Sequence, residues 1–243
     1  GIYYNSNKKK FRCYENGTWV DCIRTPRTSF YVYSDMQTSG NASLLLSTTT
    51  GGTNSITNVN SVAGHPGIWE HGTSTSATGM NSLVAHGLDT GLLGNGDAYV
   101  YEAEMRIPTL STGTETFTYR SGFMDKSDGS DATDGCYFRY SDGTNSGKWQ
   151  GVCRSNTTES TCDTGITVAA ATWYRLNVIP NSAGTSTDFQ TDGTSRCQLT
   201  TNIPTGAGRG TGFGSALTKS AGTTARTVDL DYIEVSGQLG TAR

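Results

Sequence analysis

Glu102, Glu104 and Arg106 alternate along one short stretch of the sequence and form its strongest indication of catalysis. Side chains two residues apart along a strand point to the same face of a sheet, so the two glutamates would lie side by side. Two carboxyl groups about 5–5.5 Å apart can cleave a glycosidic bond with retention of configuration. An arginine on the same face can instead pair with both glutamates. We expect this pairing on a solvated face, and the sequence assigns no catalytic residue.

A second group of carboxylates lies in a glycine-containing loop at positions 125–135, between two expected strands. Its aspartates follow one another at three-residue spacing: Asp125, Asp128, Asp131 and Asp134. Calcium takes about six to eight oxygen ligands, and such a loop can wrap around the ion, although the ligand order and closing glutamate of an EF-hand are missing. Calcium is therefore the one cofactor that the sequence suggests. The alternative is a solvated, turn-rich loop.

Two of the three histidines, His65 and His71, bracket Trp69 and Glu70, which suggests a metal site. The alternative is that His65 hydrogen-bonds to the backbone of a turn. No Gly-x-Ser-x-Gly segment is present to expose a nucleophilic serine, so nothing in the sequence indicates a serine hydrolase.

The six cysteines form an even set without a Cys-x-x-Cys pair. This pattern favours three disulfide bonds formed outside the reducing cytosol over a metal site. Cys13 and Cys22 flank Asn16-Gly17, a strong signal for a hairpin turn. We therefore expect a Cys13–Cys22 bridge across that hairpin.

The other four cysteines have two plausible pairings. We favour Cys153–Cys162 together with Cys136–Cys197. The alternative joins Cys136 to Cys153 and Cys162 to Cys197. Both arrangements link expected cross-strand neighbours, so the spacing alone does not decide between them.

Strand-sized segments separated by turns must position these groups. Three short ones lie within residues 2–22, and about twelve follow: 29–33, 67–70, 82–86, 98–107, 117–124, 136–140, 148–154, 165–168, 173–179, 187–190, 196–200 and 227–235. No helical period is evident, so the pattern predicts an all-β chain folded as an antiparallel β-sandwich or jelly roll. We place a small disulfide-bridged β-hairpin module at residues 1–26 and the sandwich at 27–243. Because a strand begins directly after Gly1, we also expect that a segment preceding it has been removed.

Alternation predicts which side chains of the longer strands face the core. One apolar face is expected for Tyr99, Tyr101, Ala103, Met105 and Ile107. A second comprises Tyr174, Leu176 and Val178, opposite Trp173, Arg175, Asn177 and Ile179. In the last strand, Val228, Leu230, Tyr232 and Glu234 are expected on the side opposite Asp229, Asp231, Ile233 and Val235.

The composition excludes several classes of protein. The chain of 243 residues carries a formal net charge of −3, and 16% of its residues are charged, whereas it holds 31 glycines, 39 threonines and 25 serines. Residues that build long helices are scarce, which excludes a coiled coil. No apolar run approaches the ~18 residues of a membrane span, and no basic stripe is present to bind nucleic acid.

From about Val62 to Val235 the sequence resembles the concanavalin A-like lectin/glucanase jelly roll, in the form found in phage tail fibre and other virion proteins. The motifs that carry the resemblance are His65-Pro66-Gly67-Ile68-Trp69, Arg120-Ser121-Gly122-Phe123-Met124-Asp125, Thr172-Trp173-Tyr174-Arg175-Leu176 and the closing Asp229-Leu230-Asp231-Tyr232. Gly1 to Cys22 is similar to a short β module of phage fibres and bacterial surface proteins.

The resemblance implies candidate sites. Glucanases of this fold carry a third acid where Arg106 stands, so the resemblance does not support catalysis by this strand. It also makes neighbours of the strands that bear a candidate sugar-binding set, since sugars need an aromatic platform and hydrogen-bonding groups. That set is Tyr119, Arg120, Tyr137, Arg139 and Arg154; Trp149 is expected to face the core.

We therefore expect a non-catalytic structural or receptor-binding protein, a fibre, spike or decoration protein outside the cell or on a virion, that recognises a surface carbohydrate. Its expected partners are a host-surface glycan, further virion proteins and copies of itself, as a trimer. The alternatives are a polysaccharide depolymerase on the same fold and a purely structural decoration domain.

Overall fold

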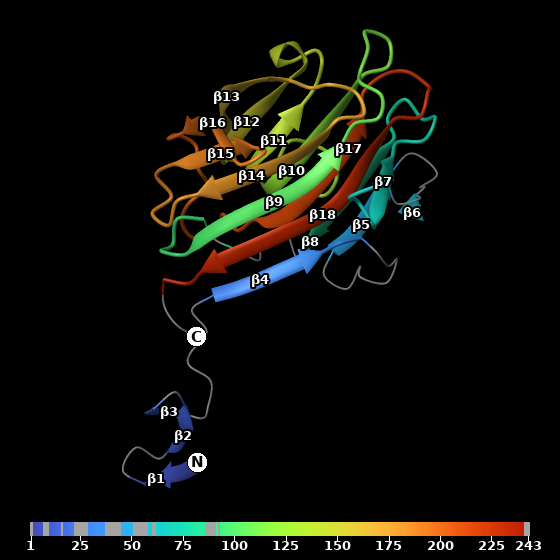
Figure 1. Cartoon of the computed structure of the whole chain (residues 1–243). Coiled ribbons are helices and arrows are strands. Elements are labelled where there is room, and N and C mark those ends of the chain that lie inside the picture. Colours follow the sequence, from blue (N-terminus) through green and yellow to red (C-terminus); the bar gives the residue numbers. More distant parts are fainter. Residues whose placement is uncertain are drawn as a thin grey trace.

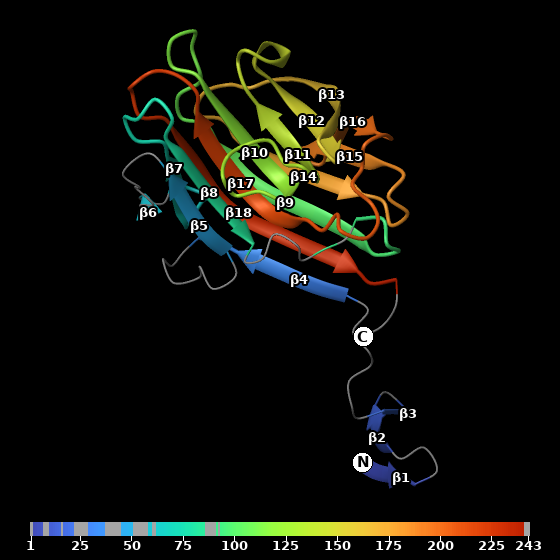
Figure 2. The same ribbon diagram turned by 180° about the vertical axis from the view of Figure 1, so that it is seen from behind.

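The computed structural model of the chain consists of β-strands arranged in three sheets (Figure 1). It describes residues 2–6, 10–15, 17–21, 29–36, 45–50, 58–59, 62–85, 91 and 93–240. The smallest sheet has the order β1-β2-β3, from β1 (Ile2–Asn5), β2 (Lys10–Glu15) and β3 (Thr18–Asp21). In Figures 1 and 2 it stands apart from the other two sheets. The division at residue 26 remains a prediction, because residues 22–28 lie outside the described part of the chain.

Two antiparallel sheets pack against each other as a jelly-roll sandwich, which confirms the predicted fold class. The seven-stranded sheet follows the order β13 (Thr158–Thr167), β12 (Lys148–Ser155), β11 (Gly135–Tyr140), β10 (Phe117–Met124), β17 (Gly212–Lys219), β8 (Met80–Ala85) and β5 (Leu45–Thr50). The eight-stranded sheet follows the order β16 (Thr194–Leu199), β15 (Thr187–Thr191), β14 (Trp173–Pro180), β9 (Ala98–Arg106), β18 (Thr227–Gln238), β7 (Ile68–Gly72) and β6 (Asn58–Val59). Its remaining strand, β4 (Ser29–Ser34), pairs with the second half of β18, beyond the part that pairs with β7.

The core lies between the two sheets and is rich in aromatic rings. Trp149 is fully buried and makes edge-to-face contacts with Tyr119, Phe138, Tyr140 and Tyr174, at centroid distances of 5.9–6.3 Å. Edge-to-face packing brings the positive edge of one ring to the negative face of the next, which adds to the stabilisation from burial. The predicted inward position of Trp149 is confirmed.

The predicted faces of β9 and β14 are also confirmed. Every second residue of β9 from Tyr99 to Met105, with Ile107 after it, belongs to the buried core, as do Tyr174, Leu176 and Val178. Strict alternation therefore holds along the two central strands, which are paired with each other over six positions.

The predicted faces of β18 are wrong in its second half. The register between β9 and β18 shifts between Leu230 and Tyr232, as expected for a β-bulge. The extra residue moves the following side chains to the opposite faces of the sheet. Val228, Leu230, Ile233 and Val235 therefore enter the core, whereas Tyr232 does not.

Two disulfide bonds decide between the pairings that the spacing left open. Cys136 and Cys153 lie opposite each other on β11 and β12 and are bonded, and Cys162 is bonded to Cys197. The favoured pairing, Cys153–Cys162 with Cys136–Cys197, is wrong because Cys162 lies opposite Gly151 rather than opposite Cys153.

The bond between Cys162 and Cys197 joins β13 to β16, which are edge strands of different sheets. Cys13 is also disulfide-bonded, but its predicted partner Cys22 lies outside the described residues. Oxidised cysteines are typical of secreted and extracellular proteins. None of the helices in the described part of the chain has both the length and the hydropathy to cross a membrane.

Candidate functional site

The outward side of the eight-stranded sheet carries a concentration of acids and aromatic rings. We call this surface the site face and define it as the side chains of β4, β7, β9, β14 and β18 that point away from the core, together with His65. Figure 1 looks onto these strands, with the seven-stranded sheet behind them. Strand register brings distant parts of the sequence into rows across this face.

One row crosses four strands. Tyr33 of β4 lies opposite Glu234 of β18, which lies opposite Glu102 of β9, and Glu102 lies opposite Asn177 of β14. The amide of Asn177 donates a hydrogen bond to Glu102, and the hydroxyl of Tyr232 donates another. Glu102 is therefore held in place by two neutral donors and not by Arg106, contrary to the predicted pairing.

The next row contains the β-bulge. Tyr232 lies opposite Glu104, and Glu104 lies opposite Arg175. Because Leu230 and Ile233 both face the core, the two residues between them, Asp231 and Tyr232, have no place there. The bulge thus adds a carboxylate to the site face that regular alternation could not supply alongside Tyr232.

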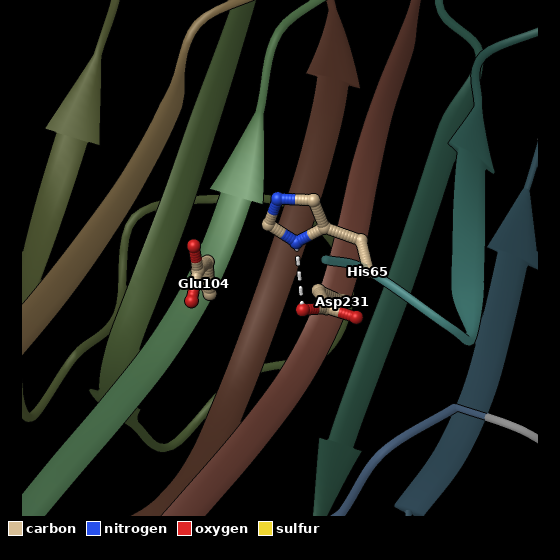
Figure 3. A group of neighbouring side chains, drawn as sticks. All are labelled: His65, Glu104 and Asp231. Carbon is tan, nitrogen blue, oxygen red and sulfur yellow. Dashed lines mark hydrogen bonds and ion pairs between the residues drawn. The ribbon is translucent and has the colours of Figure 1, made fainter. Parts of the chain in front are cut away.

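His65, Glu104 and Asp231 come together at this bulge from three separate segments (Figure 3). Nδ1 of His65 lies 2.8 Å from Oδ2 of Asp231, within hydrogen-bond distance. One potential ligand atom from each of the three residues lies within 4.8 Å of the other two. The side chains of His65 and Asp231 are 14% and 10% exposed, so the cluster is largely shielded from solvent.

A stack of rings fixes the orientation of the imidazole. The ring of His65 packs face to face on Trp173, with a centroid distance of 3.9 Å. The guanidinium of Arg106 lies 4.9 Å from the centre of the Trp173 ring, and its Nε donates a 2.6 Å hydrogen bond to Asp229. Arg106 is thus committed to Trp173 and Asp229.

Negative charge dominates the site face. Its acids are Glu70, Glu102, Glu104, Asp229, Asp231 and Glu234, and its arginines are Arg106 and Arg175. Burial raises the pKa of Glu104; His65 and Arg175 oppose the rise and Asp231 adds to it. Burial also raises the pKa of Glu70, and the neighbouring Asp229 raises it further. The charges on this face are only partly compensated.

Three tyrosines extend from this cluster toward the edge of the sheet. Tyr31 and Tyr33 stack with centroids 6.2 Å apart, and Tyr33 lies 5.9 Å from Tyr232. Tyr31 and Tyr33 are 62% and 45% exposed, and the hydroxyl of Tyr31 donates a hydrogen bond to Glu234. The result is a row of rings, open to solvent, that ends beside the carboxylates.

The sugar-binding set predicted from the sequence is divided by the structure. Tyr119 is fully buried in the core, where burial raises its pKa to about 12. The others gather on the outward side of the seven-stranded sheet, which we call the arginine face and define by Arg120, Arg139 and Arg154 with the carboxylates that they bind, Asp131 and Glu159. That this set binds a sugar remains a prediction.

Asp131 occupies the centre of the arginine face. It accepts a 2.8 Å hydrogen bond from Arg120 and lies 3.4 Å from both Arg139 and Arg154. Burial alone would raise the pKa of Asp131, but the three guanidinium groups outweigh it and hold that pKa below its usual value. Arg139 also makes a two-pronged contact with Glu159, at 2.8 and 3.0 Å.

The acidic loop is therefore fastened to this face, and its four aspartates do not converge. Asp134 pairs with Arg209 at 2.9 Å, Asp125 accepts the backbone N–H of Thr133, and Asp128 accepts the hydroxyl of Ser130. Each carboxylate instead satisfies a local donor or an arginine. Calcium binding by this loop remains a prediction.

The two imidazoles of the predicted histidine site do not share a site. His71 is fully buried between the sheets, with Nδ1 3.0 Å from Asn81 and Nε2 2.9 Å from Ser215. Burial lowers the pKa of His71 to about 4, so it is neutral at pH 7. His65 instead lies on the outer surface, with Asp231 of β18 and Trp173 of β14 as its partners.

Glu102 and Glu104 were predicted from the sequence, and His65 was considered only as a partner of His71. The other residues of the site were not predicted: Tyr31, Tyr33, Trp173, Asp231 and Tyr232. Two signals pointed toward them. The polar faces assigned to β9 and β14 were right, and the closing Asp229-Leu230-Asp231-Tyr232 segment was part of the resemblance. The alternation of residues did not indicate the β-bulge that brings Asp231 to this face.

Comparisons with known proteins agree on the fold. Protein SO2946 of unknown function from Shewanella oneidensis has a TM-score of 0.63 at 17% identity, covering 90% of this chain and 91% of that chain. An endo-1,3-β-glucanase from Streptomyces sioyaensis has a TM-score of 0.58 at 11% identity, covering 90% and 99%. Peanut lectin with a 9mer peptide has a TM-score of 0.56 at 9% identity, covering 86% and 98%.

These likenesses confirm the concanavalin A-like lectin/glucanase architecture and do not separate binding from catalysis. A search of curated proteins finds no match. The family model described as SO2946-like, C-terminal domain, matches residues 64–231, which include His65, the whole of β9 and the bulge up to Asp231. The chain belongs to this SO2946-like family.

Proposed function

We propose that the site face binds a carbohydrate outside the cell. The observation that carries this proposal is the exposed tyrosine row that ends beside a group of carboxylates. Sugar rings present C–H groups that pack on aromatic faces and hydroxyls that hydrogen-bond to carboxylates. Tyr31, Tyr33 and Tyr232 provide the first kind of surface, and Glu102 and Glu234 lie at hydrogen-bonding distance from two of these rings.

The surroundings of this row support the proposal. Glu102 is held by Asn177 and Tyr232, so its orientation is fixed before a ligand arrives. Fixed polar groups lose little conformational entropy on binding. The fold also resembles those of a lectin and an endo-1,3-β-glucanase, which supports the proposal by analogy of fold.

In its finer form, the proposal is a non-catalytic fibre, spike or decoration protein on a virion surface. Its partners would be a host-surface glycan, other virion proteins and copies of the same chain in a trimer. Residues 1–26 would form a separate module there. This form rests on the sequence resemblance, and light scattering of the intact assembly tests the trimer.

Glycan-array screening of the full chain, followed by titration calorimetry with the best ligand, tests the binding proposal. We expect binding to at least one array glycan and a loss of affinity of about tenfold or more in Tyr33→Ala, since one aromatic contact contributes about 0.5–1.5 kcal/mol beyond its buried area. Tyr14→Ala is the matched control, because Tyr14 is 51% exposed on the separate small sheet. Equal losses in both variants, or no glycan bound at all, would contradict the proposal.

A glycoside hydrolase is the second candidate. Glu104 and Asp231 have carboxylate oxygens within 4.8 Å of each other, close to the separation of about 5–5.5 Å in retaining glycosidases. Asp231 lies on β18, whereas the third acid of the glucanase pattern was expected on β9, at the position of Arg106. Incubation with the bound polysaccharide decides: new reducing ends that disappear in Glu104→Gln would favour hydrolysis, and none would favour binding alone.

A further inference from the structure

His65, Glu104 and Asp231 offer one imidazole nitrogen and two carboxylates to a common point (Figure 3). We propose that these three residues bind a divalent transition-metal cation, of which Zn²⁺ and Mn²⁺ are the probes of choice. Imidazole suits zinc, copper, iron and nickel, and carboxylate oxygen suits manganese, so a mixed set favours ions that accept both donors. This site goes beyond the proposed function, because it requires no glycan.

The spacing of the donor atoms fits a metal ion. A zinc ion about 2.0–2.2 Å from each of its nitrogen and oxygen ligands has neighbouring ligands about 3.3 Å apart. Here Nδ1 of His65 and Oδ2 of Asp231 are 2.8 Å apart, so this pair opens by about 0.5 Å around the ion, and Glu104 completes a triangle with sides below 4.8 Å. A small rotation of the Glu104 side chain, which makes no hydrogen bond to any residue in the described ranges, closes the remaining gap.

The residues behind the cluster hold it in the required orientation. Trp173 packs against the whole imidazole ring, and Arg106 packs on the tryptophan while Asp229 holds the arginine. Metal sites depend on such outer contacts to fix the ring plane of a histidine ligand. Asp231 is positioned by the bulge, whose flanking residues are anchored in the core.

Local charge favours a cation at this point. Two carboxylates face a neutral or singly charged imidazole, and four more acids share the same face with only two arginines. Both His65 and Asp231 are largely shielded from solvent, which reduces the screening of these charges. A divalent ion would relieve the repulsion between Glu104 and Asp231.

Three protein ligands leave at least one coordination position of the ion open, as in catalytic zinc sites. That position can take water or a ligand hydroxyl. A bound cation also occupies both carboxylates, so it excludes their use as a free acid and base in hydrolysis. The cation site and the hydrolase candidate are therefore alternatives, because both use Glu104 and Asp231.

Titration calorimetry on the full chain, stripped with EDTA and dialysed, tests the proposal with ZnCl₂ and MnCl₂ separately. We expect one equivalent of at least one ion to bind, with affinity reduced tenfold or more in each of Asp231→Asn and Glu104→Gln. Glu234→Gln on the same face, Asp128→Asn in the acidic loop and His86→Asn are the controls and should leave the affinity unchanged. Thermal melting of every variant without metal confirms that it is folded.

The nuclear magnetic resonance signals of the His65 ring provide a second readout, since metal binding at Nδ1 shifts them and weak surface binding does not. The proposal is overturned if neither ion binds stoichiometrically, or if binding persists in the double variant Glu104→Gln/Asp231→Asn. Loss of binding in His86→Asn with His65 signals unmoved would overturn it as well. Glycan binding is measured separately, so its failure leaves this result intact.

Discussion

The two outer faces of the sandwich both carry clustered charges, but they differ in how those charges are compensated. On the arginine face, three guanidinium groups surround Asp131 and Glu159, and the loop that contributes Asp131 packs its Ala132 against Tyr137 and Val152. On the site face, six acids share two arginines, and the turn bearing His65 adds an imidazole to the acid cluster. On both faces, antiparallel strand pairing brings the charged residues together.

This difference separates scaffold from site. Paired and covered charges satisfy one another, so the arginine face has little left to offer a ligand. Partly buried carboxylates that are only partly compensated lower the stability of the folded protein. Groups with shifted pKa values concentrate at functional sites. The predicted sugar-binding set relied on residue types alone, which both faces share.

The largest expected effect comes from a histidine between the sheets and not from either charged face. If this effect is absent, acid sensitivity must come from the charged faces instead. His71, between the sheets, has a pKa lowered from 6.5 to about 4 by burial. The unfolded chain therefore binds a proton below pH 6.5 that the folded chain refuses until about pH 4. Stability should be complete above pH 6.5 and fall by about 3 kcal/mol as the pH drops toward 4.

Urea denaturation at pH 7 and pH 4.5 measures this loss. His71→Gln has no imidazole to protonate, so its stability should change much less between the two pH values. An equal loss in wild type and variant would assign acid sensitivity to the charged faces instead.

Removing the charge at the centre of the arginine face should have the next largest effect. Asp131→Asn leaves three arginines short of a partner, and we expect a loss of about 2 kcal/mol, discounted from the 3–5 kcal/mol of a fully buried pair because Asp131 is 33% exposed. Guanidinium denaturation curves measure it. Stability within about 0.5 kcal/mol of wild type would show that the loop is not held by this ion pair.

A smaller effect tests whether the arginine face also binds the ligand. Arg154→Met removes contacts to Asp131, Glu159 and the carbonyl of Thr157 but keeps most of the apolar stem. We expect about 1 kcal/mol of lost stability and unchanged affinity in the glycan titration. A tenfold loss of affinity at unchanged stability would instead support the original sugar-binding prediction for this face.

The smallest expected effect has the opposite sign. Glu104→Gln removes a partly buried carboxylate that lies within 4.8 Å of Asp231. In the presence of EDTA, we expect the variant to be as stable as wild type or more stable, by up to about 1 kcal/mol, because like-charge repulsion is relieved. Thermal melting measures the difference. A marked decrease would mean that Glu104 is compensated and belongs to the scaffold.

Much of the fold could be predicted because alternation and turn residues act locally. The strand faces of β9 and β14 and the inward Trp149 depend only on a period of two, and the structure has them as expected. The faces of β18 failed after Leu230, since a single bulged residue reverses every later side chain and leaves no clear signal in composition.

The candidate site was harder to predict because its members meet only in space. His65, Glu104 and Asp231 are far apart in the sequence, and their meeting depends on the order β9-β18 in the sheet. The acidic loop shows the same limit, because the partners of its carboxylates also come from distant parts of the sequence. Its spacing suggested an ion, but the arginines that neutralise Asp131 come from β10, β11 and β12, which sequence reasoning had assigned to another site.

The bond between Cys162 and Cys197 has a mechanical consequence. It links the β13 edge of one sheet covalently to the β16 edge of the other, so one side of the sandwich is closed by a disulfide bond. Among the described strands, those at the opposite side, β5 and β6, contain no cysteine. Strand fraying, proteolytic nicking and unfolding under a pulling force should therefore begin on the β5–β6 side, so that amide protons of β5 and β6 exchange faster than those of the disulfide-linked edge strands β13 and β16.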